Sequence, residues 1–295
     1  MCEMSYSNIQ FEEFCNNIRM SDSMIENIRY KYHRITKCIN QTYWYSSSET
    51  DHSLYVGSYG RGTSIDSSDI DIVVELPYTV FSRYKTYSGN GPSSLLQHVR
   101  NSLLDTYSQS NISGDGQVVS IIFTDMTFEI VPVSRNYDGT YEYPDTNNGG
   151  SWKNMDPRSE KSEMDSMNKV CNHNLKRLCR MIRAWNIYND VSLHGQFIDA
   201  TCYDFIKSYV NKSQSYLYYD EMSRDYFKYM LDRNDRTYWY MPGSNRTVYP
   251  IYSFKRDVKV AYELATSAIE SQNKGNMYTA CKTWREIFGT NFPSY

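Results

Sequence analysis

The feature that most constrains this chain is the stretch GSYGRGTSIDSSDIDIVVELP, which runs from Gly57 to Pro77. It begins as a loop rich in glycine and hydroxyl groups and continues as DIDIVVELP, which has the β-branched composition of a buried strand and ends at a proline. Asp69 and Asp71 are two positions apart, so on a strand both side chains leave the same face. Buried carboxylates are costly unless a cation or hydrogen-bond donors meet them. The fold must therefore compensate these two charges.

A divalent cation is the simplest partner for Asp69 and Asp71, because two like charges held close together raise each other's pKa unless a cation neutralises them. Mg²⁺ prefers carboxylate oxygens, waters and substrate phosphates. A third ligand is expected from a neighbouring strand, and TFEIVPV offers Glu129 between two apolar residues. Asp125 competes for this role, but it lies at a predicted turn, which suits a turn aspartate better. The predicted metal ligands are Asp69, Asp71 and Glu129.

The loop before the strand predicts a phosphate site. Gly57 and Ser58 follow the apolar run LYV; a glycine there lets backbone N–H groups approach an anion, and the serine hydroxyl can donate a further hydrogen bond. The donor-rich stretch continues through Gly60, Arg61, Gly62 and Thr63. The glycines do not follow the dinucleotide-binding order, and the P-loop lysine is absent. A triphosphate bound at Gly57 and Ser58 would present its metal-chelating oxygens to the carboxylates.

A second charged cluster is expected on a helix from about Glu163 to Asn186. Helical spacing gives this helix an apolar stripe at Leu175, Leu178, Ile182 and Trp185 and a basic face at Lys176, Arg180 and Arg183. The basic face has two interpretations, a clamp on the triphosphate or an ordinary solvated surface. On the residues alone both interpretations remain open.

The remaining pattern predicts an α+β protein. Helices are expected from Ser21 to about Tyr43 and in GPSSLLQHVRNSLLDTY, and QVVSIIFTDMTFEIVPV predicts a hairpin. The stretch from Asn136 to Pro157 is expected to be a long loop or crossover, after which helical patterns dominate. We therefore expect a small mixed sheet with an N-terminal helix in residues 1–150, a helical lobe in residues 151–295, and an active site in the cleft between them.

The composition of the chain excludes several kinds of binding partner and site. A net charge of -3 and a pI near 6.0 argue against a protein that coats nucleic acid. No run of about 18 apolar residues exists, and MCEMSYSNIQFEEF lacks the features of a signal peptide, so we expect a cytoplasmic protein without membrane contact. The seven cysteines are scattered, odd in number and never spaced C-x-x-C, which favours reduced thiols over disulfides or zinc.

The segments GSYGRGTSIDSSDIDIVVELP and FEIVPV carry a resemblance to a known group of proteins. In them the chain resembles the nucleotidyltransferase superfamily of DNA polymerase beta type. It is most similar to the CD-NTase or SMODS group, the bacterial relatives of cyclic GMP-AMP synthase and oligoadenylate synthetase. The segments GGSWKNMDPRSE, NKVCNHNLKRLCRMIRAWN and WREIFGTNFP extend the resemblance over nearly the full chain. One departure is Glu129, where the group often has aspartate. The resemblance also implies a cationic contact from the basic helix, for which Lys176 and Arg180 are expected, ahead of Lys169.

The resemblance implies a template-independent synthase that makes a cyclic di- or oligonucleotide from nucleoside triphosphates through a linear intermediate. It also implies a role in antiphage signalling of the CBASS type and a downstream effector protein activated by the product. The residues themselves support in-line attack of a ribose hydroxyl on an α-phosphate at two Mg²⁺ ions about 3.5 to 4 Å apart, for which Mn²⁺ can substitute. The expected catalytic residues are Asp69, Asp71 and Glu129.

Two alternatives remain open at this point. One is nucleotide transfer to RNA, protein or a small acceptor. The other is a nucleotide-binding sensor without catalysis, which the three retained acids disfavour.

Overall fold

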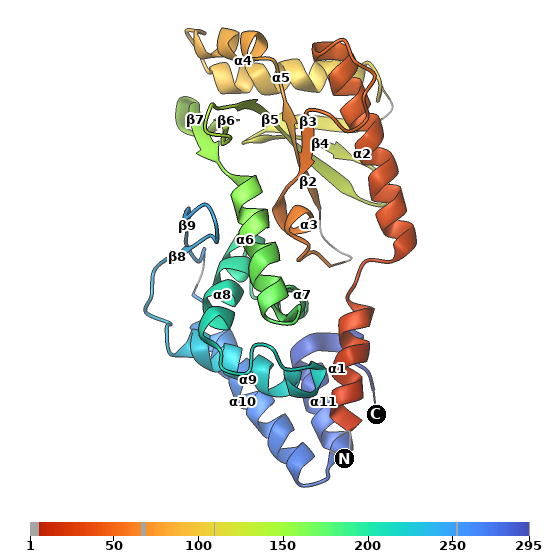
Figure 1. Ribbon diagram of the computed structural model, residues 1–295, viewed down its shortest axis with the longest axis vertical. Coiled ribbons are helices and arrows are strands. Elements are labelled where there is room, and N and C mark those ends of the chain that lie inside the picture. Colours follow the sequence, from red (N-terminus) through yellow and green to blue (C-terminus); the bar gives the residue numbers. More distant parts are fainter. Residues whose placement is uncertain (1–5, 66–68, 109, 252, 295) are drawn as a thin grey trace. The chain divides into compact units, whose positions relative to one another are not determined.

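The computed structural model describes residues 6–65, 69–108, 110–251 and 253–294 (Figure 1). Residues 66–68 of the aspartate-bearing loop therefore lie outside the described part. The chain divides into two compact units. We call Ser21–Arg61 with Ser67–Arg158 the core unit, and Met1–Met20 with Gly62–Asp66 and Ser159–Tyr295 the helical unit.

The core unit is built on a mixed sheet in the order β1-β2-β5-β4-β3. Its strands are β1 (Ser53–Tyr55), β2 (Ile70–Glu75), β3 (Asn111–Asp115), β4 (Val118–Ile122) and β5 (Thr127–Arg135). Strands β2 and β5 are parallel, whereas β1–β2, β3–β4 and β4–β5 are antiparallel. The small mixed sheet and the hairpin turning at Thr124 and Asp125 are thus confirmed.

The described part of the core unit also contains the helices α2 (Asp22–Tyr43), α3 (Gly57–Arg61), α4 (Tyr78–Lys85) and α5 (Gly91–Leu104). Helix α2 begins as predicted, because the hydroxyl of Ser21 accepts a hydrogen bond from the backbone N–H of Met24. Helix α5 packs on β3, β4 and β6. It does so through the predicted apolar face, Leu95, Leu96, Val99 and Leu103, all of them buried.

The segment expected to be a loop or crossover instead forms a second hairpin, so this prediction is wrong. Strand β6 (Tyr141–Asp145) pairs with the end of β5 and with β7 (Ser151–Met155), and a 3-10 turn, η1 (Asn147–Gly149), joins the two. The polar composition hides the alternation, but Tyr141 is fully buried and donates a 2.6 Å hydrogen bond to Glu75. Because β7 pairs with β6, residues 151–155 belong to the sheet, and a boundary at residue 150 is too early.

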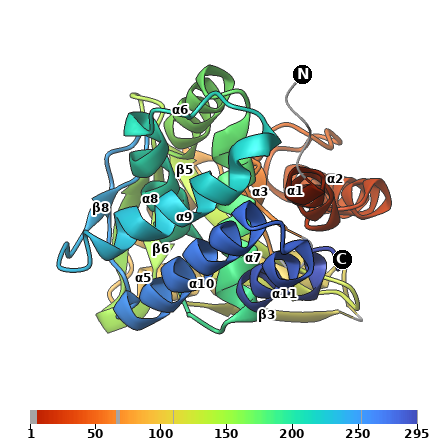
Figure 2. The same ribbon diagram turned by 90° about the horizontal axis from the view of Figure 1, so that it is seen from below.

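The helical unit contains α1 (Tyr6–Asn17), α6 (Pro157–Val170), α7 (Asn174–Tyr188), α8 (Gly195–Ser208), α9 (Tyr219–Leu231), α10 (Lys255–Asn273) and α11 (Met277–Phe288). It also contains a two-stranded hairpin, β8 (Trp239–Tyr240) with β9 (Thr247–Val248), and the 3-10 turns η2 (Tyr216–Tyr218) and η3 (Gly289–Asn291). Helices α9, α10 and α11 lie side by side (Figure 2). Helix α1 packs against α9 and α11, so the first helix belongs here and not with the sheet. No helix in the described residues has the length and apolarity needed to cross a bilayer.

The single helix expected from about Glu163 to Asn186 is two helices, α6 and α7, separated at residues 171–173. Asn172 and His173 adopt left-handed backbone angles, with φ of 52° and 65°. Asparagine and histidine enter this region more readily than most residues, which accounts for a break without glycine or proline. The predicted apolar stripe of α7 is buried as expected.

Candidate functional site

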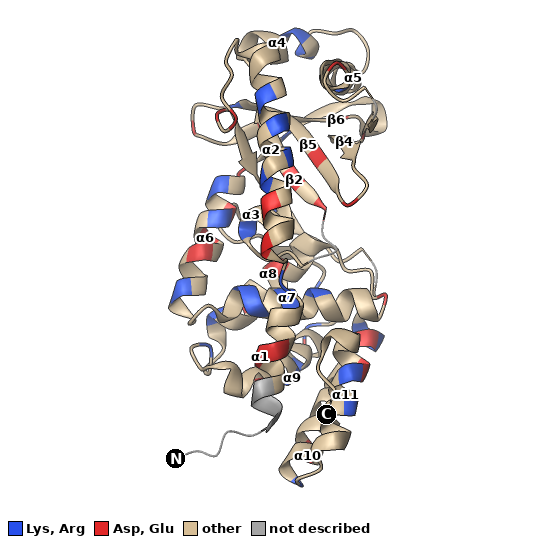
Figure 3. Ribbon diagram, turned by 90° about the vertical axis from the view of Figure 1, so that its right-hand side faces the viewer, with Lys and Arg blue, Asp and Glu red and all other residues tan. Residues whose placement is uncertain are grey.

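The parallel pairing of β2 and β5 brings two of the predicted carboxylates together. Asp71 and Glu129 are register partners, so both side chains point to the same face of the sheet. The acidic positions on β2 and β5 are visible as red segments of neighbouring strands (Figure 3). The flanking residues Ile70, Ile72 and Phe128 are almost completely buried, so the two acids project from a sheet whose opposite face is core.

The environment of Asp71 disfavours its charged form. Burial raises its pKa to about 7, with further increases from the charge of Glu129, from its hydrogen bond to Glu129 and from Asp69, while Arg61 opposes the shift. Burial and the charge of Asp69 also raise the pKa of Glu129, against a decrease from its hydrogen bond with Asp71. Both pKa values are thus raised, which favours a pair that shares one proton.

Asp69 lies one residue before β2 and is exposed. It influences the pair through its charge, but no set of three His, Cys, Asp or Glu side chains in the described residues is close enough to hold a metal ion. The competitor Asp125 points elsewhere: its carboxylate accepts a 2.6 Å hydrogen bond from Lys31 of α2 and another from Asn27. The structure thus pairs Glu129, and not Asp125, with Asp71.

Gly57 is held against the Asp71 carboxylate. Its φ is +58°, a backbone conformation that L side chains rarely adopt. A Cβ atom at this position would overlap the Oδ2 atom of Asp71, well inside van der Waals contact. Glycine is therefore required both by the backbone angle and by the lack of space for a Cβ atom, and the backbone at the start of α3 packs directly on the acid. Ser58 follows directly in α3.

Arg61 is a further residue of this site, to which the sequence assigns no role beyond that of one donor of the loop. It is the last residue of α3, only 4% exposed, and its charge lowers the pKa of Asp71. The available signal is a cation placed between two glycines and eight to ten residues before the aspartates. Nothing in the sequence shows that this cation is buried.

The basic residues of α7 have specific partners within the helical unit. Lys176 forms an ion pair with Asp165 of α6, and its Nζ would lie 3.0 Å from a Cβ atom at Gly62. Arg180 donates a 2.9 Å hydrogen bond to the carbonyl oxygen of Gly62. The predicted basic face is therefore partly engaged with the protein itself. Lys169, the least favoured candidate, is exposed in the last turn of α6.

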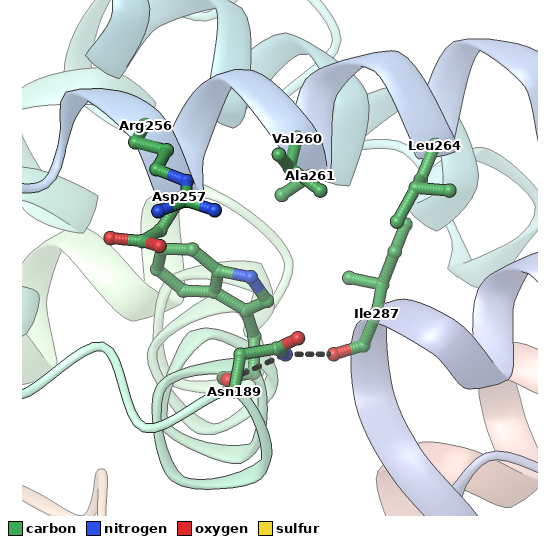
Figure 4. Close-up of a pocket in the computed structure, with 8 residues that line it drawn as sticks. Asn189, Arg256, Asp257, Val260, Ala261, Leu264 and Ile287 are labelled. Atoms are coloured by element: carbon green, nitrogen blue, oxygen red, sulfur yellow. Dashed lines mark hydrogen bonds between the residues drawn. The ribbon is translucent and has the colours of Figure 1, made fainter.

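A cavity of about 220 Å³ also occurs in the helical unit, between α7, α10 and α11 (Figure 4). The amide of Asn189 closes one side by donating hydrogen bonds to the carbonyl oxygens of Trp185 and Ile287. Arg256 and Asp257 contribute charged groups. None of the predicted site residues lines this cavity, so it is separate from the carboxylate site.

The sheet thus carries two acids on adjacent parallel strands beside a glycine turn, which is the arrangement predicted for a nucleotidyltransferase core. The family model of the Second Messenger Oligonucleotide or Dinucleotide Synthetase (SMODS) domain matches residues 4–168, more than half of the chain. The chain therefore belongs to the SMODS family of nucleotidyltransferases, and the resemblance seen in the sequence is confirmed.

Relatives with known names agree with this assignment. A probable cyclic nucleotide synthase of Bacillus cereus (strain VD146) is 21% identical over 263 residues, covering 83% of this chain and 77% of the relative. The fold is similar to that of CdnC of E. coli MS115-1, solved with ATP, with a TM-score of 0.70, 14% identity and 99% of each chain covered. It is also similar to the Vibrio cholerae cyclic AMP-GMP synthase DncV, solved with a linear intermediate, with a TM-score of 0.71, 13% identity and coverage of 95% and 93%.

The contact between Gly57 and Asp71 predicts a large cost for Gly57→Ala. Gly116 is the matched control, because its φ is +61° but nothing lies within 4 Å of an added Cβ. Gly116→Ala should therefore report backbone strain alone, about 1 kcal/mol, whereas Gly57→Ala adds the overlap with Asp71. Urea denaturation should show a clearly larger loss for Gly57→Ala. Equal losses for the two variants would mean that the close approach is not present.

The raised pKa of Asp71 predicts a dependence of stability on pH in the absence of divalent cations. The unfolded carboxyl ionises near its ordinary value of 3.8 and the folded one only near 7, so wild-type stability should fall as pH rises from about 4 to 7 and then level off. Asp71→Asn removes this loss and should be more stable than wild type above pH 7, by on the order of 1 to 3 kcal/mol, with no advantage near pH 4.

Chemical denaturation between pH 4 and 8 measures this difference. The exposed Asp51→Asn is the control and should follow wild type throughout. A constant difference between Asp71→Asn and wild type at every pH would contradict the account.

Proposed function

We propose that this protein is a template-independent synthase that joins nucleoside triphosphates into a cyclic di- or oligonucleotide and releases pyrophosphate. The observation that carries the proposal is the Asp71–Glu129 pair on adjacent parallel strands, with Gly57 against it, in a chain of the SMODS family. The names of the relatives support it, since DncV is a cyclic AMP-GMP synthase and a Rhodothermus marinus CdnE of similar fold is a c-UMP-AMP synthase.

We propose Mg²⁺ as the cofactor, with two ions bound and Mn²⁺ able to substitute. The donor set fits, because carboxylate oxygens are the ligands that Mg²⁺ prefers. The raised pKa of Asp71 beside Glu129 shows that two negative charges are unfavourable there, and a cation would neutralise them in place of a proton. Asp69, exposed at the entrance to β2, is the proposed third ligand. When bound, the metal lowers the pKa of the attacking ribose hydroxyl and stabilises the leaving pyrophosphate.

The protein's own groups orient the triphosphate in this proposal. The backbone at Gly57 and the hydroxyl of Ser58 bind the phosphates, and the close packing of Gly57 on Asp71 keeps phosphate and carboxylate side by side. Arg61 reduces the repulsion between the acids and an incoming anion. Lys176 and Arg180 are the proposed cationic contacts from α7; for Lys176 this requires exchange of its partner Asp165 for phosphate.

The product is proposed to act in antiphage signalling of the CBASS type, in the cytoplasm, by activating a downstream effector protein. The family description supports the signalling part, since it names a second messenger as the product of such domains. The choice of nucleotides follows from contacts with the bases, which the sheet and its acids do not determine.

Mass spectrometry of products formed from all four ribonucleoside triphosphates with Mg²⁺ or Mn²⁺ tests the proposal. We expect phosphatase-resistant cyclic products from wild type. Asp69→Ala combined with Asp71→Ala should lower the rate by at least about 10³-fold, because metal ligands supply several kcal/mol of transition-state stabilisation. Asp125→Ala is the matched control and should keep most of the activity, since Asp125 contacts Lys31.

The outcomes separate the alternatives. Transfer of radiolabel from nucleotide to RNA or to a protein, with no free cyclic product, would support an acceptor-modifying nucleotidyltransferase instead. No product from any nucleotide pair with either metal would contradict the proposal.

A further inference from the structure

The chain between the phosphate loop and the aspartates is anchored in the helical unit. Residues 62–65, which follow Arg61 of the core unit, belong to the helical unit. We call the described part, Gly62 to Ile65, the strap. The strap connects α3, with Gly57 and Ser58, to the segment that carries Asp69 and Asp71.

Two contacts hold the ends of the strap. The carbonyl oxygen of Gly62 accepts the 2.9 Å hydrogen bond from Arg180, and its φ of +70° is a backbone conformation that L side chains rarely adopt. At the other end Ile65 is 6% exposed and packs in the apolar core of the helical unit. The strap is therefore fixed by backbone and side-chain contacts, and is not a loose connection.

The centre of the strap is held by a buried ion pair. Thr63 donates a 3.1 Å hydrogen bond from Oγ1 to Oδ2 of Asp199 on α8. The same Oδ2 atom accepts a 3.0 Å hydrogen bond from Nη2 of Arg183, and Nη1 of Arg183 lies 2.9 Å from Oδ1 of Asp199. Thr63 and Asp199 are completely buried and Arg183 is 5% exposed. We call these three residues the clasp.

The clasp is an unusual way to stabilise a fold. Removing two charges from water costs several kcal/mol per ion, and a buried ion pair often adds no net stability over apolar residues of similar volume. What apolar residues cannot provide is a directional hydrogen bond to the strap. The ion pair presents a fixed carboxylate oxygen, and the hydroxyl of Thr63 binds to it.

We propose that Thr63, held by Asp199 and Arg183, is a positioning residue for nucleotidyl transfer; the inference rests on the proposed function. Thr63 follows Ser58 and precedes Asp69 by only a few residues, and each residue spans at most about 3.6 Å. Gly62 follows α3 directly, so a displacement of the strap would be passed to α3 and to Ser58 within it. A misplacement of about 1 Å between reacting groups can cost 10²-fold in rate.

Thr63→Val tests the inference, because it keeps the shape of the side chain and removes the hydroxyl, while Asp199 keeps Arg183 as its partner. We expect kcat to fall about 10- to 100-fold with a much smaller change in KM for nucleotide. Thr63→Ser restores the hydroxyl and should restore most of kcat. Thr201→Val is the matched control, since Thr201 is a buried threonine of α8 whose hydroxyl contacts Tyr226 and not the strap.

A second variant separates positioning from folding. Replacing the ion pair by apolar residues, Arg183→Met with Asp199→Leu, removes both buried charges together, although Thr63 and the Gly195 carbonyl each lose a hydrogen bond. The unfolding midpoint should therefore fall far less than when one charge alone is removed. The double variant should nevertheless reproduce the loss of kcat, because Thr63 then has no carboxylate to bind. Full activity of this double variant, or equal losses of kcat in Thr63→Val and Thr201→Val, would overturn the inference.

Hydrogen exchange gives a readout that does not depend on activity. In Thr63→Val the backbone amides of residues 58–65 should exchange faster than in wild type, while those of β5 remain unchanged. Inactive wild-type protein would contradict the proposed function alone, and the exchange data would still decide on the clasp. If the exchange rates of residues 58–65 are the same in Thr63→Val and in wild type, the positioning role of the clasp is refuted.

Discussion

The burial of Asp71 beside Glu129 is the constraint on which the rest of the site depends. Parallel pairing of β2 and β5 places both acids on one face, and the backbone of Gly57 closes the space next to Asp71. Without a cation, burial and the neighbouring acids raise the pKa of Asp71 to about 7, and Arg61 partly offsets their effect. The free protein therefore carries an electrostatic cost at neutral pH that a divalent cation would relieve, as expected for the proposed catalytic role.

Much of this site can be predicted from the sequence. An acid between apolar residues of a strand marks a side chain that faces away from the core, and this pattern points to both Asp71 and Glu129. Alternation on a strand also determines which acids share a face. Asp125 lies at a turn, which disfavours it as a metal ligand. The residue type at a cap, Ser21, likewise determines the start of α2. These features depend on local geometry, which neighbouring residues in the chain determine.

The features that the sequence does not reveal depend on contacts distant in the chain. Helical spacing places Arg183 on the basic face of α7, but spacing gives an angular position and does not show that Asp199 of α8 buries the charge. The hairpin of β6 and β7 lies in a segment rich in Gly, Asn, Asp and Pro, and its pairing and the burial of Tyr141 show that it belongs to the sheet. The break before α7 occurs at His173, whose left-handed backbone is not marked by a glycine or a proline.

The central claim is that Asp71 and Glu129 together bind a divalent cation. Anomalous diffraction from crystals grown with Mn²⁺ and a non-hydrolysable nucleotide tests it most directly. The account predicts an anomalous peak within about 2.0 to 2.6 Å of carboxylate oxygens of both Asp71 and Glu129, and its loss in Asp71→Asn. A peak at Asp125, or an ordered nucleotide at Gly57 with no anomalous peak beside Asp71, would contradict the account.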